Sequence, residues 1–182
     1  MPWPRTLAAM SKKHNIEPRI GIDIGRVIMA PVTGGKADTS FLSGTLERAM
    51  QTPPSPGAFE GVKTLVEAFS GRAWLVSKAG PNVQHKTKLW LRHWDFYAAT
   101  GLAAGHVRFC LERPQKAGHC RQLKITHFID DRLDVLEALR GDVPHLYLFG
   151  EQPRLEEIPG WTVHVADWER AVVAVLRRLE GR

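Results

Sequence analysis

Apolar residues along the chain gather in six short runs that alternate with segments of helical periodicity. Each run is almost continuously apolar and several are rich in Val, Ile or Phe, as expected of strands buried on both faces of a parallel sheet. The six runs are 19–24, 73–77, 107–111, 125–130, 145–150 and 161–167.

Between these runs, apolar residues recur at the spacing of helices that bury one face. The stripes predict helices over Phe59–Phe69, Val83–Tyr97, Leu133–Leu139 and Val172–Leu179. Strands that alternate with helices predict a doubly wound α/β domain of three layers, with a parallel sheet in the middle. We expect this single domain to span residues 18–182, after a flexible tail at 1–17.

Residues 30–57 break the alternation, because they are rich in turn-forming sequences such as TGGK and PPSPG. We expect a β-hairpin with Thr33–Lys36 at its tip, followed by a short helix at Thr45–Met50. The insert begins just after Asp23, so we interpret it as a small flap or minimal cap over a site. The alternative is a surface excursion without a role.

Composition fits an ordinary soluble protein. The chain has 182 residues, of which 43% are hydrophobic and 24% charged. Its two cysteines, Cys110 and Cys120, have no metal-binding spacing, which favours a reducing compartment, and we expect the cytoplasm. No apolar run approaches the about 20 residues of a membrane helix. A frayed tail is favoured over a transit peptide at residues 1–17.

The net charge of +6 and the pI of about 9.6 favour anionic ligands such as phosphates and nucleotides. The basic residues are scattered, apart from one modest cluster at Lys86, Lys88 and Arg92. Simple solubility is therefore the stronger interpretation of the charge, and a nucleic-acid partner has no sequence support.

Polar residues follow four of the predicted strands. The first run reaches Asp23, the second ends on Ser77 and Lys78, Lys116 follows the third, and the fourth ends on Asp130–Asp131. In an open parallel sheet, ligands bind beyond the carboxyl ends of the strands. Each residue alone could be a helix or turn cap, but four in this order predict one site.

This set of residues suits phosphoryl transfer. A carboxylate such as Asp23 can attack phosphorus and form an aspartyl phosphate. Because carboxylate and phosphate repel each other, a cation must lie between them, and Mg²⁺ binds carboxylates together with substrate oxygens. Asp23 and Asp130 fit that need, while Ser77 and Lys116 could hold phosphate oxygens.

Four motifs then resemble those of the haloacid dehalogenase superfamily, in the family's order. They are GIDIGRVI, WLVSKAG, Lys116 within ERPQKAGHC, and HFIDDRLDVLEAL. The resemblance implies that Asp23 is the nucleophile and a Mg²⁺ ligand, that the carbonyl of Gly25 and Asp130 are further ligands, and that Asp131 binds through water or as an alternative. Ser77 and Lys116 would bind phosphate, with Lys78 beside Ser77. PPSPGAFEGV and IDDR are similar to 5′(3′)-deoxyribonucleotidases, although those carry a fuller helical cap.

Gly25 departs from the family pattern, in which an Asp two residues after the nucleophile is the general acid/base. Such help is worth about 10² to 10⁴ in rate. Three alternatives follow: slow hydrolysis of phosphomonoesters, replacement of the acid by Asp131 or a flap residue, or binding without turnover. The neighbouring Arg26 either meets a phosphate or another anionic substrate group, or is a surface arginine or one paired with Asp131.

Lys116 is favoured for the third motif over Lys124, Lys86 and Lys88, because a helix and then a strand follow it. The sequence therefore predicts a Mg²⁺-dependent phosphatase-type hydrolase, with an inactive phospholigand- or protein-binding protein as the alternative. The small insert predicts an open site. It would take a large phosphorylated substrate or be closed by a second copy of the chain in a homodimer; a small phosphorylated molecule is the other substrate class.

Overall fold

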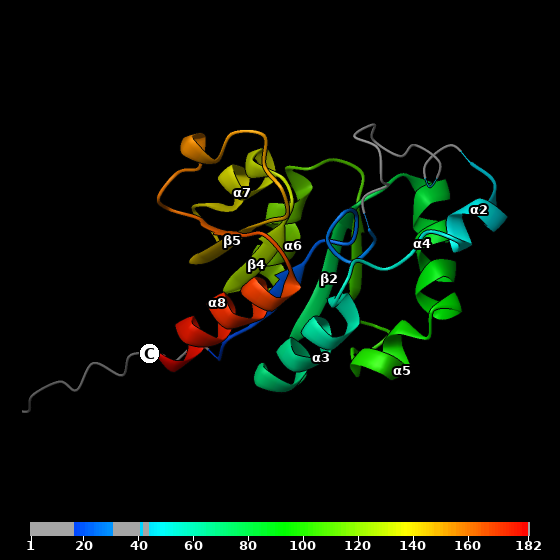
Figure 1. The fold of residues 1–182 in the computed structure, drawn as a ribbon, viewed down its shortest axis with the longest axis horizontal. Coiled ribbons are helices and arrows are strands. Elements are labelled where there is room, and N and C mark those ends of the chain that lie inside the picture. The colour runs from blue at the N-terminus through cyan, green and yellow to red at the C-terminus, as the bar shows by residue number, and fades with distance from the viewer. Residues whose placement is uncertain (1–16, 31–40, 42–43, 182) are drawn as a thin grey trace, which may run out of the picture.

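Six parallel strands form the middle layer of the domain, in the order β3-β2-β1-β4-β5-β6 (Figure 1). The computed structural model describes residues 17–30, 41 and 44–181. The strands are β1 Ile20–Ile22, β2 Ala73–Lys78, β3 Val107–Cys110, β4 His127–Asp130, β5 His145–Phe149 and β6 Val163–Val165. Each lies within, or within one residue of, a predicted run, so the α/β prediction is confirmed.

Helices cover both faces of the sheet because strand residues alternate between two hydrophobic cores. On β2, Leu75 faces one core while Trp74 and Val76 face the other. The first core is closed by α3 (Ala58–Ala68), α4 (Pro81–His93), α5 (Phe96–Thr100) and α8 (Trp168–Glu180), and the second by α6 (Gln115–Leu123) and α7 (Leu133–Leu139). The expected three layers are therefore present.

Two glycines permit close packing that a side chain would block. A Cβ at Gly21 on β1 would lie 2.5 Å from the Phe128 ring of β4, and one at Gly61 on α3 would lie 2.4 Å from the Trp168 ring of α8. Both distances are far below van der Waals contact. Gly61 therefore allows Trp168, the first residue of α8, to pack closely against α3.

The stripe from Val83 to Tyr97 forms two helices, where the sequence predicted one. Helix α4 ends at His93, and Asp95 takes the left-handed conformation with φ of 49° before α5 begins. Trp90 and Phe96 are nevertheless both fully buried in the same core. Because both helices face one core, the apolar spacing continues across the break at Asp95. The periodicity of the sequence therefore does not reveal that the helix is interrupted.

The insert after β1 is tied to the domain at its base. Met29 forms an isolated antiparallel bridge with Pro54, and α2 (Leu46–Met50) confirms the short helix, with Thr45 capping its start. The indoles of Trp90 and Trp94 donate to the Thr52 carbonyl (2.7 Å) and the Met50 carbonyl (3.1 Å). The predicted hairpin tip at 33–36 and the tail at 1–16 lie outside the described residues.

Both cysteines are buried free thiols. Within the described part of the chain, no helix is long and apolar enough to cross a membrane.

Candidate active site

The chain leaves β1 in a single helical turn that begins directly after Asp23. The Asp23 amide still donates to the Ile129 carbonyl of β4 at 2.9 Å, which holds this residue at the sheet edge. The amides of Ile28 and Met29 both donate to the Ile24 carbonyl. Arg26 lies in this turn with φ of 59°, a conformation that L-residues rarely adopt. The turn therefore fixes the direction of Asp23.

Two remote segments hold this turn from outside. The buried indole of Trp168, at the start of α8, donates to the Val27 carbonyl at 2.9 Å. The Ser55 amide at the end of the insert donates to the Ile28 carbonyl at 2.7 Å. The turn carrying Asp23 is thus positioned by the C-terminal helix and by the base of the insert.

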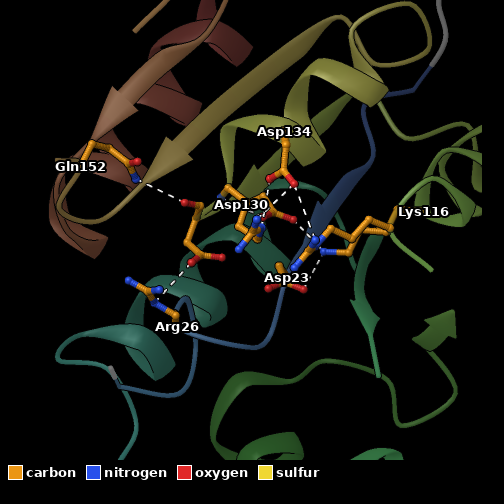
Figure 2. Close-up of polar contacts among 9 residues, drawn as sticks. Asp23, Arg26, Lys116, Asp130, Asp134 and Gln152 are labelled. Carbon is orange, nitrogen blue, oxygen red and sulfur yellow. Dashed lines mark hydrogen bonds and ion pairs between the residues drawn. The ribbon is translucent and has the colours of Figure 1, made fainter. Parts of the chain in front are cut away.

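Lys116 joins two of the predicted acids. Its ammonium donates to Oδ1 of Asp23 and to Oδ2 of Asp130, both at 2.7 Å, and its side chain is only 3% exposed (Figure 2). It lies in the first turn of α6, where Gln115 accepts hydrogen bonds from the amides of the preceding loop. Helix α6 therefore delivers one buried cation between two carboxylates from β1 and β4.

Asp130 and Asp131 occupy the end of β4. The fully buried Asp130 also accepts a hydrogen bond from the Arg132 amide at 3.0 Å. Asp131 lies 3.4 Å from the Arg26 guanidinium, whose side chain is 62% exposed. The Gln152 amide after β5 donates to the Asp131 carbonyl at 3.3 Å (Figure 2). Arg26 therefore forms the ion pair with Asp131 that was expected as an alternative to binding the substrate.

Burial and mutual repulsion raise the pKa of both acids. The pKa of Asp130 rises to about 7, because burial and the charge of Asp23 outweigh Lys116. The pKa of Asp131 rises to about 6, for burial and again the Asp23 charge. Burial would lower the pKa of Lys116, but the two carboxylates raise it instead. Lys116 is therefore charged at neutral pH, and the acids gain from a further cation.

The donor set fits a hard divalent cation. Asp23, Asp130 and Asp131 each offer a carboxylate oxygen, and these oxygens lie within 4.8 Å of one another. Opposite ligands of Mg²⁺ are about 4 Å apart, since each Mg²⁺–O distance is about 2.0–2.1 Å. Gly25 is close as well, because a Cβ there would lie 3.9 Å from Oδ2 of Asp23. These carboxylates could hold Mg²⁺ after small shifts.

Ser77 and Lys78 reach the same edge on the strand next to β1. Ile22 pairs with Leu75, so Ser77 lies at the same level as the turn that follows Asp23. Ser77 is buried and Lys78 is exposed. The structure describes no hydrogen bond from Ser77 to the acids, so its phosphate-binding role stays a prediction.

The rival lysines lie elsewhere. Lys86 donates to the carbonyl of Gly44 at 2.6 Å, Lys88 lies over the Phe109 ring, and Lys124 follows the end of α6. Of these candidates, Lys116 is the one with a described contact to the acids.

Sequence reasoning missed two residues that support the site. Gln152 and Trp168 act through backbone carbonyls, and no motif marks a side chain that bonds to a carbonyl far along the chain. The Asp167 cap before Trp168 marks a helix start, but nothing in it indicates a contact with the turn after Asp23.

Two solved structures are similar to the chain. A protein assigned as a haloacid dehalogenase-like hydrolase from Burkholderia xenovorans is 13% identical with a TM-score of 0.58, and the match covers 89% of this chain and 99% of that one. A haloacid dehalogenase-like family hydrolase from Xanthomonas campestris is 16% identical with a TM-score of 0.53, covering 74% of this chain and 61% of that one. No family model and no curated protein matches the sequence.

Identities this low concern the fold. The chain has the haloacid dehalogenase-like α/β fold, as its four motifs predicted. The narrower likeness to deoxyribonucleotidases stays a prediction.

Proposed function

We propose that the protein is a Mg²⁺-dependent hydrolase of phosphomonoesters that works through an aspartyl phosphate at Asp23. The observation that carries this proposal is the position of Lys116, whose ammonium lies 2.7 Å from both Asp23 and Asp130. A structural ion pair needs one acid. A lysine shared by two acids, beside a third, suits a site that must stabilise the negative charge of a transferring phosphoryl group.

Asp23 has one oxygen available for attack. Lys116 binds Oδ1, and the described residues give Oδ2 no hydrogen-bond donor. Attack by Oδ2 forms the bond to phosphorus and breaks the ester bond, whose electron pair leaves with the alcohol oxygen. Water then cleaves the acyl phosphate, which releases inorganic phosphate and restores the carboxylate.

The other residues bind and orient the substrate in this proposal. Lys116 neutralises charge on Asp23 and on the transferring group, while Ser77 and Lys78 bind phosphate oxygens. Arg26, exposed at the mouth of the site, exchanges its contact with Asp131 for an anionic group of the substrate. Mg²⁺, bound by Asp23, Asp130 and Asp131 with the Gly25 carbonyl, would supply charge neutralisation between nucleophile and phosphate.

Gly25 sets the preferred leaving group. No side chain at this position can donate a proton to the departing oxygen, so alkyl alcohols leave slowly. We therefore expect turnover to favour esters whose leaving group is stable as an anion. The Asp131 carboxyl, with its pKa raised to about 6, could replace the missing acid only where it does not bind Mg²⁺ directly, because a carboxylate that binds the metal is ionised.

The test is hydrolysis of p-nitrophenyl phosphate with and without Mg²⁺. We expect Mg²⁺-dependent activity that Asp23→Asn abolishes, and a phosphorylated Asp23 detectable by mass spectrometry after rapid acid quench. Asp142→Asn, an acid paired with Arg121 away from the site, is the matched control and should retain full activity. Activity that survives Asp23→Asn would reject the proposal.

A second candidate is a non-catalytic protein that binds a phosphorylated ligand or a partner protein, favoured by the missing acid at Gly25. In that case no ester in a phosphate-ester panel is hydrolysed, while Mg²⁺ and phosphate together still raise the melting temperature of the wild type. Asp23→Asn would then remove that stabilisation.

A further inference from the structure

A cavity of about 370 Å³ lies between α4, α5 and the start of β3. Its lining residues are Lys88, Arg92, Tyr97, Ala104, Gly105 and Val107. Val107 is the first residue of β3, whereas the candidate active site lies beyond the carboxyl ends of β1 and β4. Through Leu75 of β2, Val107 is level with Ile22 of β1, so the cavity lies beside the edge strand β3, with β2 between it and β1. Figure 1 shows α5 at the far end of α4.

The cavity carries two cations and no acid in its lining. Lys88 and Arg92 are one helical turn apart on α4, both are exposed, and neither forms an ion pair within the described part of the chain. The Lys88 ammonium lies 5.7 Å from the centre of the Phe109 ring, which holds it toward β3. Two cations one helical turn apart repel each other, so an anion that contacts both is stabilised.

An aromatic and apolar surface adjoins these cations. Tyr97 is half-buried, and the positive charge of Arg92 acts on its phenol, partly opposing the rise in the Tyr97 pKa that burial causes. Val107 and Ala104 complete the wall. A ligand here would meet charge at one end and an apolar surface at the other, the usual combination of small-molecule sites.

We propose that this cavity binds a small organic phosphate, with the phosphate between Lys88 and Arg92 and a flat ring against Tyr97. A phosphomonoester dianion matches two cations better than a single carboxylate does. Arg92 can bind it through two parallel N–H groups. The site is separate from Asp23 and does not depend on the proposed hydrolysis.

The test is an amide NMR titration of the Asp23→Asn protein in EDTA, so that neither turnover nor metal contributes. We expect AMP to produce saturable shifts at the amides of Tyr97, Gly105 and Val107. Lys88→Ala and Arg92→Ala should each weaken AMP binding at least tenfold. Inorganic phosphate and adenosine, which each offer half of the ligand, should also bind at least tenfold more weakly than AMP.

Lys63→Ala, which removes an exposed lysine from α3, is the matched control and should leave AMP binding unchanged. The absence of saturable shifts at this cavity would overturn the proposal, as would AMP shifts confined to the amides around Asp23 and Lys116. The proposal also fails if a single-stranded oligonucleotide saturates the same amides far more tightly than AMP, since the surface would then bind nucleic acid.

Discussion

In the proposed reaction Asp23 can attack phosphorus, but Gly25 cannot protonate the leaving oxygen. Oδ2 of Asp23 accepts no hydrogen bond from the described residues, and a Cβ at Gly25 would lie 3.9 Å from it, an ordinary van der Waals contact. The φ of Gly25 does not fall in the left-handed region, so an L-residue fits there without strain. An acid at this position would thus be sterically tolerated beside the proposed nucleophile.

Gly25→Asp should therefore increase kcat for alkyl phosphates, by about 10² to 10⁴ if the acid is the only missing group. The gain should be small for p-nitrophenyl phosphate, because p-nitrophenolate needs no proton to leave. Steady-state kinetics on both esters measure this difference. Gly25→Asn controls for the added side chain and should give no gain. Equal gains on both esters would contradict the leaving-group argument.

Lys116 carries the second prediction, because it neutralises two buried carboxylates at once. Lys116→Met keeps the side-chain volume but removes the ammonium, which leaves Asp23 and Asp130 facing each other unpaired. Removing one member of a buried ion pair typically costs about 3–5 kcal/mol. We expect a loss of that order in urea unfolding at pH 8, a smaller loss at pH 5 where a carboxyl is protonated, and no measurable hydrolysis.

The exposed Lys63 again provides the control, and Lys63→Met should change the free energy of unfolding by less than about 0.5 kcal/mol. If Lys116→Met were as stable as the wild type at pH 8, the two carboxylates would not depend on this lysine.

Helix α8 contributes to the site although no residue of it reaches the acids. Gly61 lets the Trp168 ring pack against α3, and from there its indole donates to the Val27 carbonyl in the turn after Asp23. Trp168→Phe removes that donor and leaves a buried carbonyl unsatisfied, at a cost of about 1–3 kcal/mol. We expect kcat to fall while KM changes little, because the turn that aims Asp23 is loosened.

Trp161→Phe is the matched control. Trp161 is half-buried against the other core and contacts Arg140, and the structure describes no hydrogen bond from its indole. It should affect neither kcat nor the pattern of substrates. If Trp168→Phe lowered stability and left kcat unchanged, the contact would be structural alone.

The strands and most helices could be predicted because their apolar patterns reflect burial directly. The break between α4 and α5 could not, since Asp95 changes the backbone without interrupting the apolar stripe. The convergence of Asp23, Lys116 and Asp130 was predictable because Asp23 follows a strand, Asp130 ends one and Lys116 lies in the first turn of a helix; their catalytic roles stay predictions. Gln152 and Trp168 were not, because a bond to a backbone carbonyl leaves no pattern in either partner's sequence.

Across the whole domain, the site is assembled from chain segments that only the sheet brings together. β1 and β4 are neighbours in the sheet although about a hundred residues separate them in sequence. Lys116 of α6 donates hydrogen bonds to the acid that follows each of these strands or ends it, Asp23 and Asp130. A cluster of three acids and one lysine is therefore built into the folded state and absent from the unfolded chain. Its protonation must then influence global stability.

The metal-free protein should lose stability as pH rises from about 4 to about 7. Asp130 and Asp131 have folded pKa values of about 7 and about 6, above the about 3.9 of an unfolded Asp. In that window the folded state holds protons that the unfolded chain has released, so a rise in pH favours unfolding. The raised pKa of Lys116 has no effect here, because lysine is protonated in both states.

Urea unfolding in EDTA, measured at intervals from pH 4.5 to pH 8, tests this expectation against Asp130→Asn. The wild type should lose on the order of a few kcal/mol more than the variant across the window, since each pKa unit corresponds to about 1.4 kcal/mol. Mg²⁺ binds only the ionised carboxylates, so it should flatten the wild-type profile and leave the variant's slope nearly unchanged. A wild-type profile parallel to that of Asp130→Asn, with and without Mg²⁺, would mean that these acids are neither buried together nor able to bind the metal.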